Sequence, residues 1–451
     1  MPVTRARIAV EPATREEPGV AVGVDLGVDL GVADASSAAD ARSDAELADR
    51  LREAGARLNG RQPADRIVVA VPDSWLGRGI DGARRREVVR RVLADELELP
   101  LLAIIARSQA LVASQAGRDD APDRDRPRAV TACHLDDGVL AFARCEVTVA
   151  GAGPTVILTD CQDDHPAARP PDFGAVLAEA LRTRLADGPA PADTSAAAAD
   201  SLASLYAELG ARRERLRAAL SASASNAVFL SVPVLGGPGT PPAQWVTAGE
   251  IKAGFEPLAE ALTGAIRTFK AKVGPPHGVR LVLTGSAAAN PLVVELVRTE
   301  FAGRADAAES VTVTVTDDLA PARGAARVAR GMVTAELPAT APCQLPVHRI
   351  AGGRLVSDSI DLPASCYLRP AETATVLVTE GSSPPELLGD TAIPPGFYRA
   401  GLWPSLTGTV LALRPPGAAP AILVALGCRG NSNHHAGPGD GVSVTIDSER
   451  N

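Results

Sequence analysis

Short apolar runs alternate with longer amphipathic stretches through the first three quarters of the chain. The runs are rich in valine, isoleucine and leucine and end near Gly, Pro or Asp, a pattern that predicts buried strands. The predicted strands are 6–10, 19–26, 28–33, 66–71, 101–105, 129–133, 139–144, 146–149, 155–158, 227–234, 281–284 and 311–316. Apolar residues spaced three and four apart predict helices at 45–58, 83–98, 108–116, 173–185, 202–220, 248–273, from 292 onward, and at 320–331. This alternation predicts an α/β fold.

Two of the predicted helices carry start signals. Asp44 precedes the first helix and is of a residue type that caps helix N-termini. Thr247 precedes the helix 248–273, and Glu250 three residues later completes a capping box. Stretches of polar or small residues at 117–128, 186–198 and 236–242 predict a flexible break, a linker and a turn-rich loop.

The pattern changes after the helix that ends near residue 331. Residues 332–346 are rich in Pro, Thr and Ala and read as a linker. Short alternating runs punctuated by Gly and Pro then predict a small all-β domain. Its predicted strands are 347–350, 354–360, 374–379, 396–400, 409–413 and 422–425, with a further candidate at 442–446.

Composition and net charge limit the kinds of core and of partner that this chain can have. The chain is 46% hydrophobic but only 3% aromatic, so its core must consist mainly of Ala, Val and Leu. A net charge of −9 argues against nucleic-acid binding. The basic run Arg84–Arg91 has acidic neighbours at helical spacing and reads as a solvated helix face. The bias toward Ala, Arg, Asp and Pro is typical of a GC-rich bacterial genome.

No apolar leader and no long uncharged apolar window are present, so we expect a cytoplasmic protein that does not cross a membrane. The six cysteines are scattered without a C-x-x-C pair and read as reduced thiols, not as a disulfide frame or a zinc site.

The stretch most suggestive of ligand binding is Arg280–Val297. An apolar strand runs into Gly285 and Ser286, small residues follow, and a helix begins after Pro291. A strand-to-helix turn of small residues lets a ligand approach the bare backbone. The alternative is an ordinary strand-to-helix turn that needs glycine only for its geometry.

Several segments resemble, in order and spacing, the nucleotide domain of the 70-kDa heat-shock chaperone family. Val20–Gly27 is similar to that family's first phosphate loop, and Arg66–Trp75 resembles its strand-proline-helix step. Leu101–Gln115 resembles the segment that carries the family's asparagine-glutamate-proline turn. Val282–Val293 is similar to the family's adenosine loop, and Asp317–Gly331 resembles the helix that closes the nucleotide domain. More faintly, residues 376–396 resemble part of the family's substrate-binding β-sandwich.

The resemblance implies a duplicated actin-like ATPase fold of the ribonuclease H-like class. Residues 1–331 would form the nucleotide domain, with lobes of about 1–128 and 129–331. Residues 332–346 would be the linker, and 347–451 a truncated β-sandwich. ADP or ATP would then contact a set of residues carried over from the family, which are Gly138, Glu214, Arg217, Ser221, Gly285, Ser286 and Pro291.

The chain departs from the family where phosphate and metal would bind. The second phosphate loop of the family reads Asp-Leu-Gly-Gly-Gly-Thr, whereas residues 134–139 here read His-Leu-Asp-Asp-Gly-Val. Asp136 and Asp137 would repel a triphosphate in a desolvated cleft. The family's later aspartate falls on Ala141, and its glutamate after the apolar strand falls on Arg107.

The first phosphate loop departs as well. The threonines that the family has after this loop are replaced by Val28 and Asp29. The catalytic lysine has no counterpart, because the subdomain that would carry it is missing between Asp25 and the helix at 45–58. The strand 6–10 offers an alternative register, in which it is the first strand and Asp25 has no part in phosphate binding.

Other candidate residues have two interpretations. His134 is either a proton carrier or a structural histidine. Asp136 and Asp137 either bind Mg²⁺ or form an acidic turn with Gly138. Glu214 and Arg217 are either base contacts or a surface pair.

The sequence therefore predicts a chaperone-like binding or scaffold protein with no catalytic residues, no metal site and weak adenine-nucleotide binding. We expect a protein partner or peptide client. The alternatives are an active ATP-dependent chaperone with an unusual cleft and, more remotely, a sugar or acetate kinase on the same superfold.

Overall fold

The computed structural model describes residues 7–11, 20–26, 37–59, 64–77, 79–117, 127–136, 139–150, 153–162, 230–232, 244–246, 248–273, 280–302, 311–338, 343–351, 354–361, 364–368, 377–380, 386–387, 396–417 and 419–426. By their contacts they form two compact units. The first comprises Met1–Arg107, Ile157–Thr159 and Ala325–Asn451, and the second comprises Ser108–Val156 and Asp160–Gly324.

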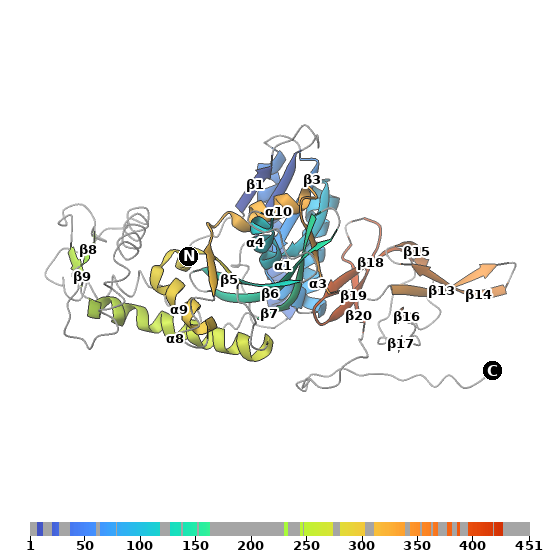
Figure 1. Cartoon of the computed structure of the whole chain (residues 1–451). Helices are drawn as coiled ribbons and strands as arrows, with labels where there is room; N and C mark the ends of the chain where they lie inside the picture. Colours follow the sequence, from blue (N-terminus) through green and yellow to red (C-terminus); the bar gives the residue numbers. More distant parts are fainter. Residues whose placement is uncertain are drawn as a thin grey trace. The chain divides into compact units, whose positions relative to one another are not determined.

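The first unit is built on the sheet β1-β2-β3-β4 (Figure 1), whose strands are β1 (Arg7–Glu11), β2 (Ala21–Asp25), β3 (Arg66–Val71) and β4 (Leu101–Ala106). β1 is antiparallel to β2, and β2, β3 and β4 are parallel. β3 is buried from Ile67 to Val71, as a strand covered on both faces must be. All four strands lie where the sequence predicts them.

The helices of this unit start earlier than predicted. α1 spans Ser37–Asn59, so Asp44 lies inside the helix and the prediction that it caps the helix is wrong. α2 (Ser74–Gly77) and α3 (Gly79–Arg90) follow β3, and α3 continues as the π-helical turn η1 (Arg91–Glu96). The Leu97 amide donates to the Val92 carbonyl (3.0 Å), five residues back, which defines the wider turn.

The second unit has a sheet in which β11, β10, β5, β6 and β7 follow in that order. Their bounds are β5 (Arg128–Asp136), β6 (Val139–Ala150), β7 (Gly153–Cys161), β10 (Arg280–Thr284) and β11 (Thr312–Val315). β6 is antiparallel to β5, whereas β10 is parallel to both β5 and β11. β6 unites two strands that the sequence pattern separates at Cys145. A small antiparallel pair, β8 (Leu230–Val232) and β9 (Gln244–Val246), belongs to the same unit.

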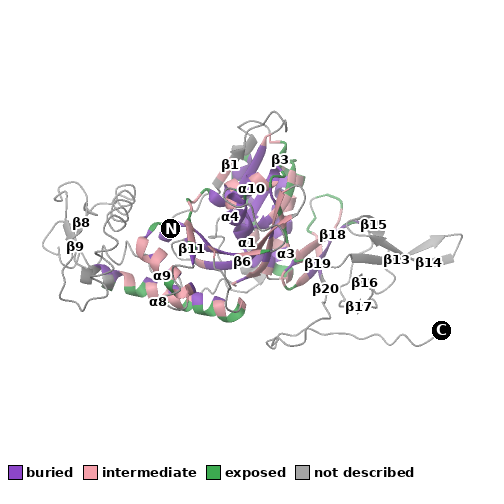
Figure 2. Ribbon diagram, viewed as in Figure 1, coloured by how far each residue is buried: buried purple, intermediate pink, exposed green. Residues whose placement is uncertain are grey.

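Three phenylalanines form the centre of the core of the second unit. Phe142 of β6, Phe269 of α8 (Ala248–Val273) and Phe301 of α9 (Pro291–Ala302) have ring centroids 5.8–6.4 Å apart. Such pairs contribute roughly 0.5–1.5 kcal/mol each beyond the area that they bury. Buried residues of α8 recur four apart, at Leu258, Leu262 and Ile266, so one face of the helix meets this core (Figure 2).

Within the second unit, Gly324 of α10 (Ala320–Ala329) lies against the backbone of α4 (Arg107–Gln115). A Cβ on Gly324 would lie 1.6 Å from the Ala110 carbonyl oxygen and 2.9 Å from the Ser114 amide nitrogen. The glycine therefore allows the two backbones to approach each other. Ala322, Ala325, Ala326 and Ala329 of α10 are completely buried.

The C-terminal strands form two antiparallel sheets. One has the order β14-β13-β16-β17, with β13 (Cys343–Ala351), β14 (Arg354–Asp361), β16 (Leu377–Glu380) and β17 (Glu386–Leu387). The other has the order β15-β18-β19-β20, with β15 (Ala364–Leu368), β18 (Gly396–Ser405), β19 (Gly408–Arg414) and β20 (Ile422–Leu426). β15 has no counterpart in the sequence prediction, and β12 (Thr334–Glu336) lies in the stretch predicted as a linker.

The mixed α/β class is confirmed, with separate antiparallel sheets after it. Several predicted features lie outside the described residues: the strands 28–33 and 442–446, the helices 173–185 and 202–220, the linker 186–198, the loop 236–242 and Thr247. Among the helices that the structure describes, none has the length and apolarity needed to span a membrane.

Candidate functional site

The turn after β10 joins three of the residues predicted to contact nucleotide. Gly285 has φ 107° and ψ 167°, a conformation that strains any residue with a side chain. Ser286 begins η2 (Ser286–Ala289), one turn of 3-10 helix, and Pro291 begins α9. Glycine is therefore required here by the backbone, and this observation alone does not distinguish the ligand-binding turn from the ordinary one.

The N-terminus of α9 is capped by the side chain of Asn290. Asn290 Oδ1 accepts a hydrogen bond from the Leu292 amide (3.0 Å), and Pro291 occupies the first helical position, where its missing N–H is of no consequence. The Asn290 side chain is completely buried, and its Nδ2 has no hydrogen-bond partner in the described part of the chain. The start of α9 therefore offers few amides to a phosphate group.

The end of β5 lies at the same sheet edge as this turn. Thr284 of β10 is in register with His134 of β5, and the strands are parallel. His134 is 1% exposed, and its Nε2 lies 3.2 Å from Ser108 Oγ, which is also buried. This burial favours the structural interpretation of His134 over a proton carrier that must reach a ligand. Asp136 is the last residue of β5.

The start of α10 is fixed by Asp317. Its Oδ1 accepts hydrogen bonds from Arg323 Nη2 (2.6 Å) and from the Leu319 amide (3.0 Å). The hydrogen bond from Arg323 and the amide bonds hold the pKa of this carboxyl below its usual value, although partial burial opposes them. The Thr284 hydroxyl donates to the Asp317 carbonyl (3.0 Å), which ties this helix start to the end of β10.

A buried ion pair stands at the corresponding edge of the first sheet. Asp25 ends β2, and Arg107 follows β4 as the first residue of α4. Arg107 Nε lies 3.2 Å from Asp25 Oδ2, and the two side chains are 2% and 0% exposed. These are the positions where the resemblance places a phosphate-loop aspartate and, in the family, a glutamate. The structure thus supplies a cation where the family has an anion.

The remaining predicted site residues, Gly138, Glu214, Arg217 and Ser221, lie outside the described residues, as do Val28, Asp29 and Asp137. Among the residues that are described, no group of three or more His, Cys, Asp or Glu side chains is placed to hold a metal ion. Cys133, Cys145 and Cys161 are buried free thiols, as predicted, and burial raises the pKa of Cys133.

The basic run of α3 differs from its prediction as a solvated face. Arg86 is 2% exposed, and burial lowers its pKa to about 10. Its Nη1 donates to the Pro404 carbonyl (2.7 Å), and its guanidinium lies 5.2 Å from the centre of the Trp403 ring. The prediction is therefore wrong for Arg86, because β18 covers this part of the helix.

Glu87, the next residue, is a hydrogen-bond hub with a 9% exposed side chain. It accepts from Arg414 Nε (2.8 Å) and Nη2 (2.9 Å), from Trp403 Nε1 (2.8 Å) and from Arg90 Nε (2.7 Å). The carboxylate thereby joins α3 to β18 and β19 of the same unit. Because both carboxylate oxygens accept hydrogen bonds, the buried charge of Glu87 is compensated and stabilises the contact of α3 with β18 and β19.

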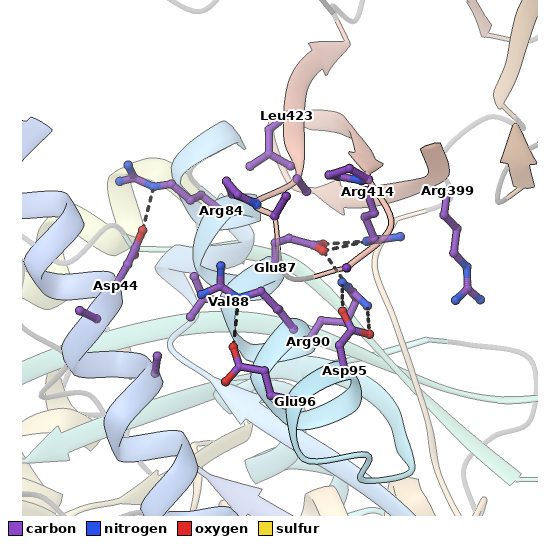
Figure 3. A pocket seen from close by; sticks show the side chains of 18 of the residues that line it. Asp44, Arg84, Glu87, Val88, Arg90, Asp95, Glu96, Arg399, Arg414 and Leu423 are labelled. Atoms are coloured by element: carbon purple, nitrogen blue, oxygen red, sulfur yellow. Dashed lines mark hydrogen bonds and ion pairs between the residues drawn. The ribbon is translucent and has the colours of Figure 1, made fainter. Parts of the chain in front are cut away.

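A cavity of about 1100 Å³ opens beside this hub, and we call it the charged groove (Figure 3). One wall consists of α1, α3 and η1, and includes Asp44, Arg84, Arg91 and Glu96. The other wall consists of β18, β19 and β20, with the proline-rich connection 415–421. Sequence reasoning missed this groove, because its two walls come from opposite ends of the chain. The clustering of Arg84–Arg91 was the only signal for it.

No family model matches this chain, and no curated protein matches it.

Proposed function

We propose that this chain is a binding protein on an actin-like ATPase fold, akin to the 70-kDa heat-shock chaperones, that has lost ATP hydrolysis. Its proposed ligands are a protein or peptide and, weakly, an adenine nucleotide held by base and ribose. The buried ion pair between Asp25 and Arg107 is the observation that carries the proposal.

The ion pair bears on catalysis through its position. In open α/β sheets, ligands bind outside the carboxyl ends of the parallel strands, and Asp25 and Arg107 stand at those ends of β2 and β4. Phosphoryl transfer needs carboxylates there that hold Mg²⁺. A divalent cation at Asp25 would meet the guanidinium of Arg107, which is permanently charged and already occupies the carboxylate.

The two sheets support the proposed duplication of the fold. In the first, β2 has an antiparallel neighbour (β1) on one side and two successive parallel strands (β3, β4) on the other. In the second, β5 has the same surroundings, with β6 antiparallel and β10 and β11 parallel. The chain order differs, since β1 precedes β2 whereas β6 follows β5.

The geometry after β10 supports base-side binding over phosphate binding. The turn presents the half-buried Ser286 and the exposed Ala289, while Asn290 already uses the first free amide of α9. Asp136 is the last residue of β5, and we propose that its negative charge lies near the bound nucleotide. Added phosphates would therefore increase repulsion without gaining amide contacts.

The first experiment measures phosphate release from ATP with Mg²⁺, together with calorimetric titration of adenosine, ADP and ATP. We expect no hydrolysis above background and an affinity for adenosine and ADP at least equal to that for ATP. Gly285→Val should abolish nucleotide binding, because valine cannot adopt the φ of 107° without strain. Gly331→Val is the matched control, at φ 77° in open space.

Two results would contradict the proposal. One is robust Mg²⁺-dependent turnover that disappears in Asp136→Ala, which would establish an active ATPase. The other is tight ATP binding with adenosine undetectable. Absence of binding by all three compounds would leave protein binding as the whole of the proposed function.

A further inference from the structure

The charged groove has the size and openness of a polypeptide site. Its volume of about 1100 Å³ exceeds the roughly 300–1,000 Å³ that is usual for small-molecule pockets. Residues of α1 and α3 line one side of the groove.

Most of the charges in the groove already have partners. Arg84 Nε lies 3.6 Å from Asp44 Oδ2, and Arg90 Nη2 lies 2.8 Å from Asp95 Oδ2. Glu96 is held by Arg52 Nη2 (2.9 Å) and by Arg91 Nε (3.5 Å). The helical wall is therefore a network of paired arginines and carboxylates, which gives its side chains a fixed arrangement.

Arg399 differs from the other arginines of the groove. It is exposed on β18, in register with Arg414 on β19, and Arg414 is already bound to Glu87. Within the described residues, Arg399 makes no ion pair, and no dashed line reaches it in Figure 3. Among the described residues that line the groove, six are arginines and five are carboxylates, an excess of one positive charge on a chain of net charge −9.

The opposite wall carries an apolar strip beside Arg399 and Arg414. Pro415, Pro416 and Pro420 have fixed φ angles and no N–H groups, so this wall offers ring surface without requiring hydrogen bonds. Leu423 lies on the same wall, and Ile80 of α3 is 43% exposed at the groove. A preformed apolar wall lowers the entropy cost of binding.

We propose that the charged groove binds an extended acidic polypeptide segment with aliphatic side chains. A carboxylate of the segment pairs with the Arg399 guanidinium, whose planar fork suits bidentate contact. The aliphatic side chains pack on the proline wall and on Ile80. This inference names the partner class within the proposed binding function, and it places that partner on a different site from the nucleotide.

The test uses the full chain without nucleotide and two fluorescein-labelled nine-residue probes. In one probe leucine alternates with glutamate, and in the other lysine replaces each glutamate. Fluorescence anisotropy should give at least tenfold tighter binding of the glutamate probe, and the difference should shrink as NaCl rises. Arg399→Glu should weaken the binding of the glutamate probe at least tenfold. Arg267→Glu is the matched control, since Arg267 has a 73% exposed side chain on α8 in the second unit.

Equal affinity for the two probes, no binding of either probe, or an Arg399→Glu variant that binds as the wild type does would overturn the inference. Thermal unfolding of both variants identifies any loss of folding, and the comparison of probes on the wild-type chain is independent of it. Because nucleotide is absent, failure here leaves the ATP and adenosine titrations of the proposed function unaffected.

Discussion

At the scale of the residue, the most informative feature is the arginine at position 107, where the resemblance to the chaperone family places a glutamate. Asp25 and Arg107 have side chains that are 0% and 2% exposed, and each compensates charge on the other. A buried pair of this kind adds little net stability over an apolar pair, yet removing one member leaves an uncompensated buried charge.

Arg107→Ala should therefore lower the stability of the chain by about 3–5 kcal/mol. The midpoint of urea unfolding measures this, with Arg267→Ala on an exposed side chain as the control, expected to change stability by less than about 0.5 kcal/mol. The double variant Asp25→Asn with Arg107→Met should recover part of the loss, because no unpaired charge remains. A loss below about 1 kcal/mol in Arg107→Ala would mean that water reaches the pair.

At the scale of the element, glycine has two different roles in helices of the second unit. Gly324 of α10 lies against the backbone of α4, where a Cβ would lie 1.6 Å from the Ala110 carbonyl oxygen. Gly264 of α8 has no atom within 4 Å of the position that its Cβ would occupy. The first glycine is needed for packing, whereas the second only weakens its helix.

The same substitution should consequently have opposite effects at the two sites. Gly324→Ala should destabilise the chain by about 1–3 kcal/mol, because the helices must separate. Gly264→Ala should stabilise it by about 0.5–1 kcal/mol through helix propensity and a less flexible unfolded chain. Paired urea unfolding curves give the comparison. Equal effects of the two substitutions would mean that α4 and α10 do not pack closely.

At the scale of the whole molecule, the ion-pair hub at Glu87 links segments that are 327 positions apart in the chain. Trp403 lies between two arginines, with Arg86 at 5.2 Å and Arg414 at 5.7 Å from its ring centre. The C-terminal sheet is therefore attached to α3 by directional bonds to a nearly buried carboxylate. Such bonds contribute more than exposed ion pairs do.

A double-mutant cycle on Glu87→Gln and Arg414→Gln should give a coupling energy of about 1.5–3 kcal/mol. The control cycle uses Glu295 and Arg298, a partly exposed i, i+3 pair at 3.2 Å, where about 0.3–0.5 kcal/mol is expected. Urea unfolding followed by tryptophan fluorescence measures both cycles, and Trp403 reports directly on the first. Coupling no larger than in the control would show that the hub is open to solvent.

The sequence predicts well those features that depend on residues close together in the chain. The bounds of α8 agree at both ends, because its apolar periodicity and its starting residues all lie within one stretch. The parallel strands β3 and β4 are found because they are continuous apolar runs. The burial of Arg86 could not be predicted in this way, since Pro404 lies 318 positions away. Arg107 appeared only as a departure from a family pattern, and its pairing with Asp25 required the fold.

The discontinuity of the first unit also sets an order of events during synthesis. Ribosomes add about 5–20 residues per second, so Arg414 emerges roughly 15–65 s after Glu87. During that interval Glu87 lacks its hydrogen bonds from Arg414, and Arg86 lacks its hydrogen bond to the Pro404 carbonyl. The N-terminal sheet can form while the chain is still growing, but the contacts that close the first unit form only after Arg414 has been synthesised.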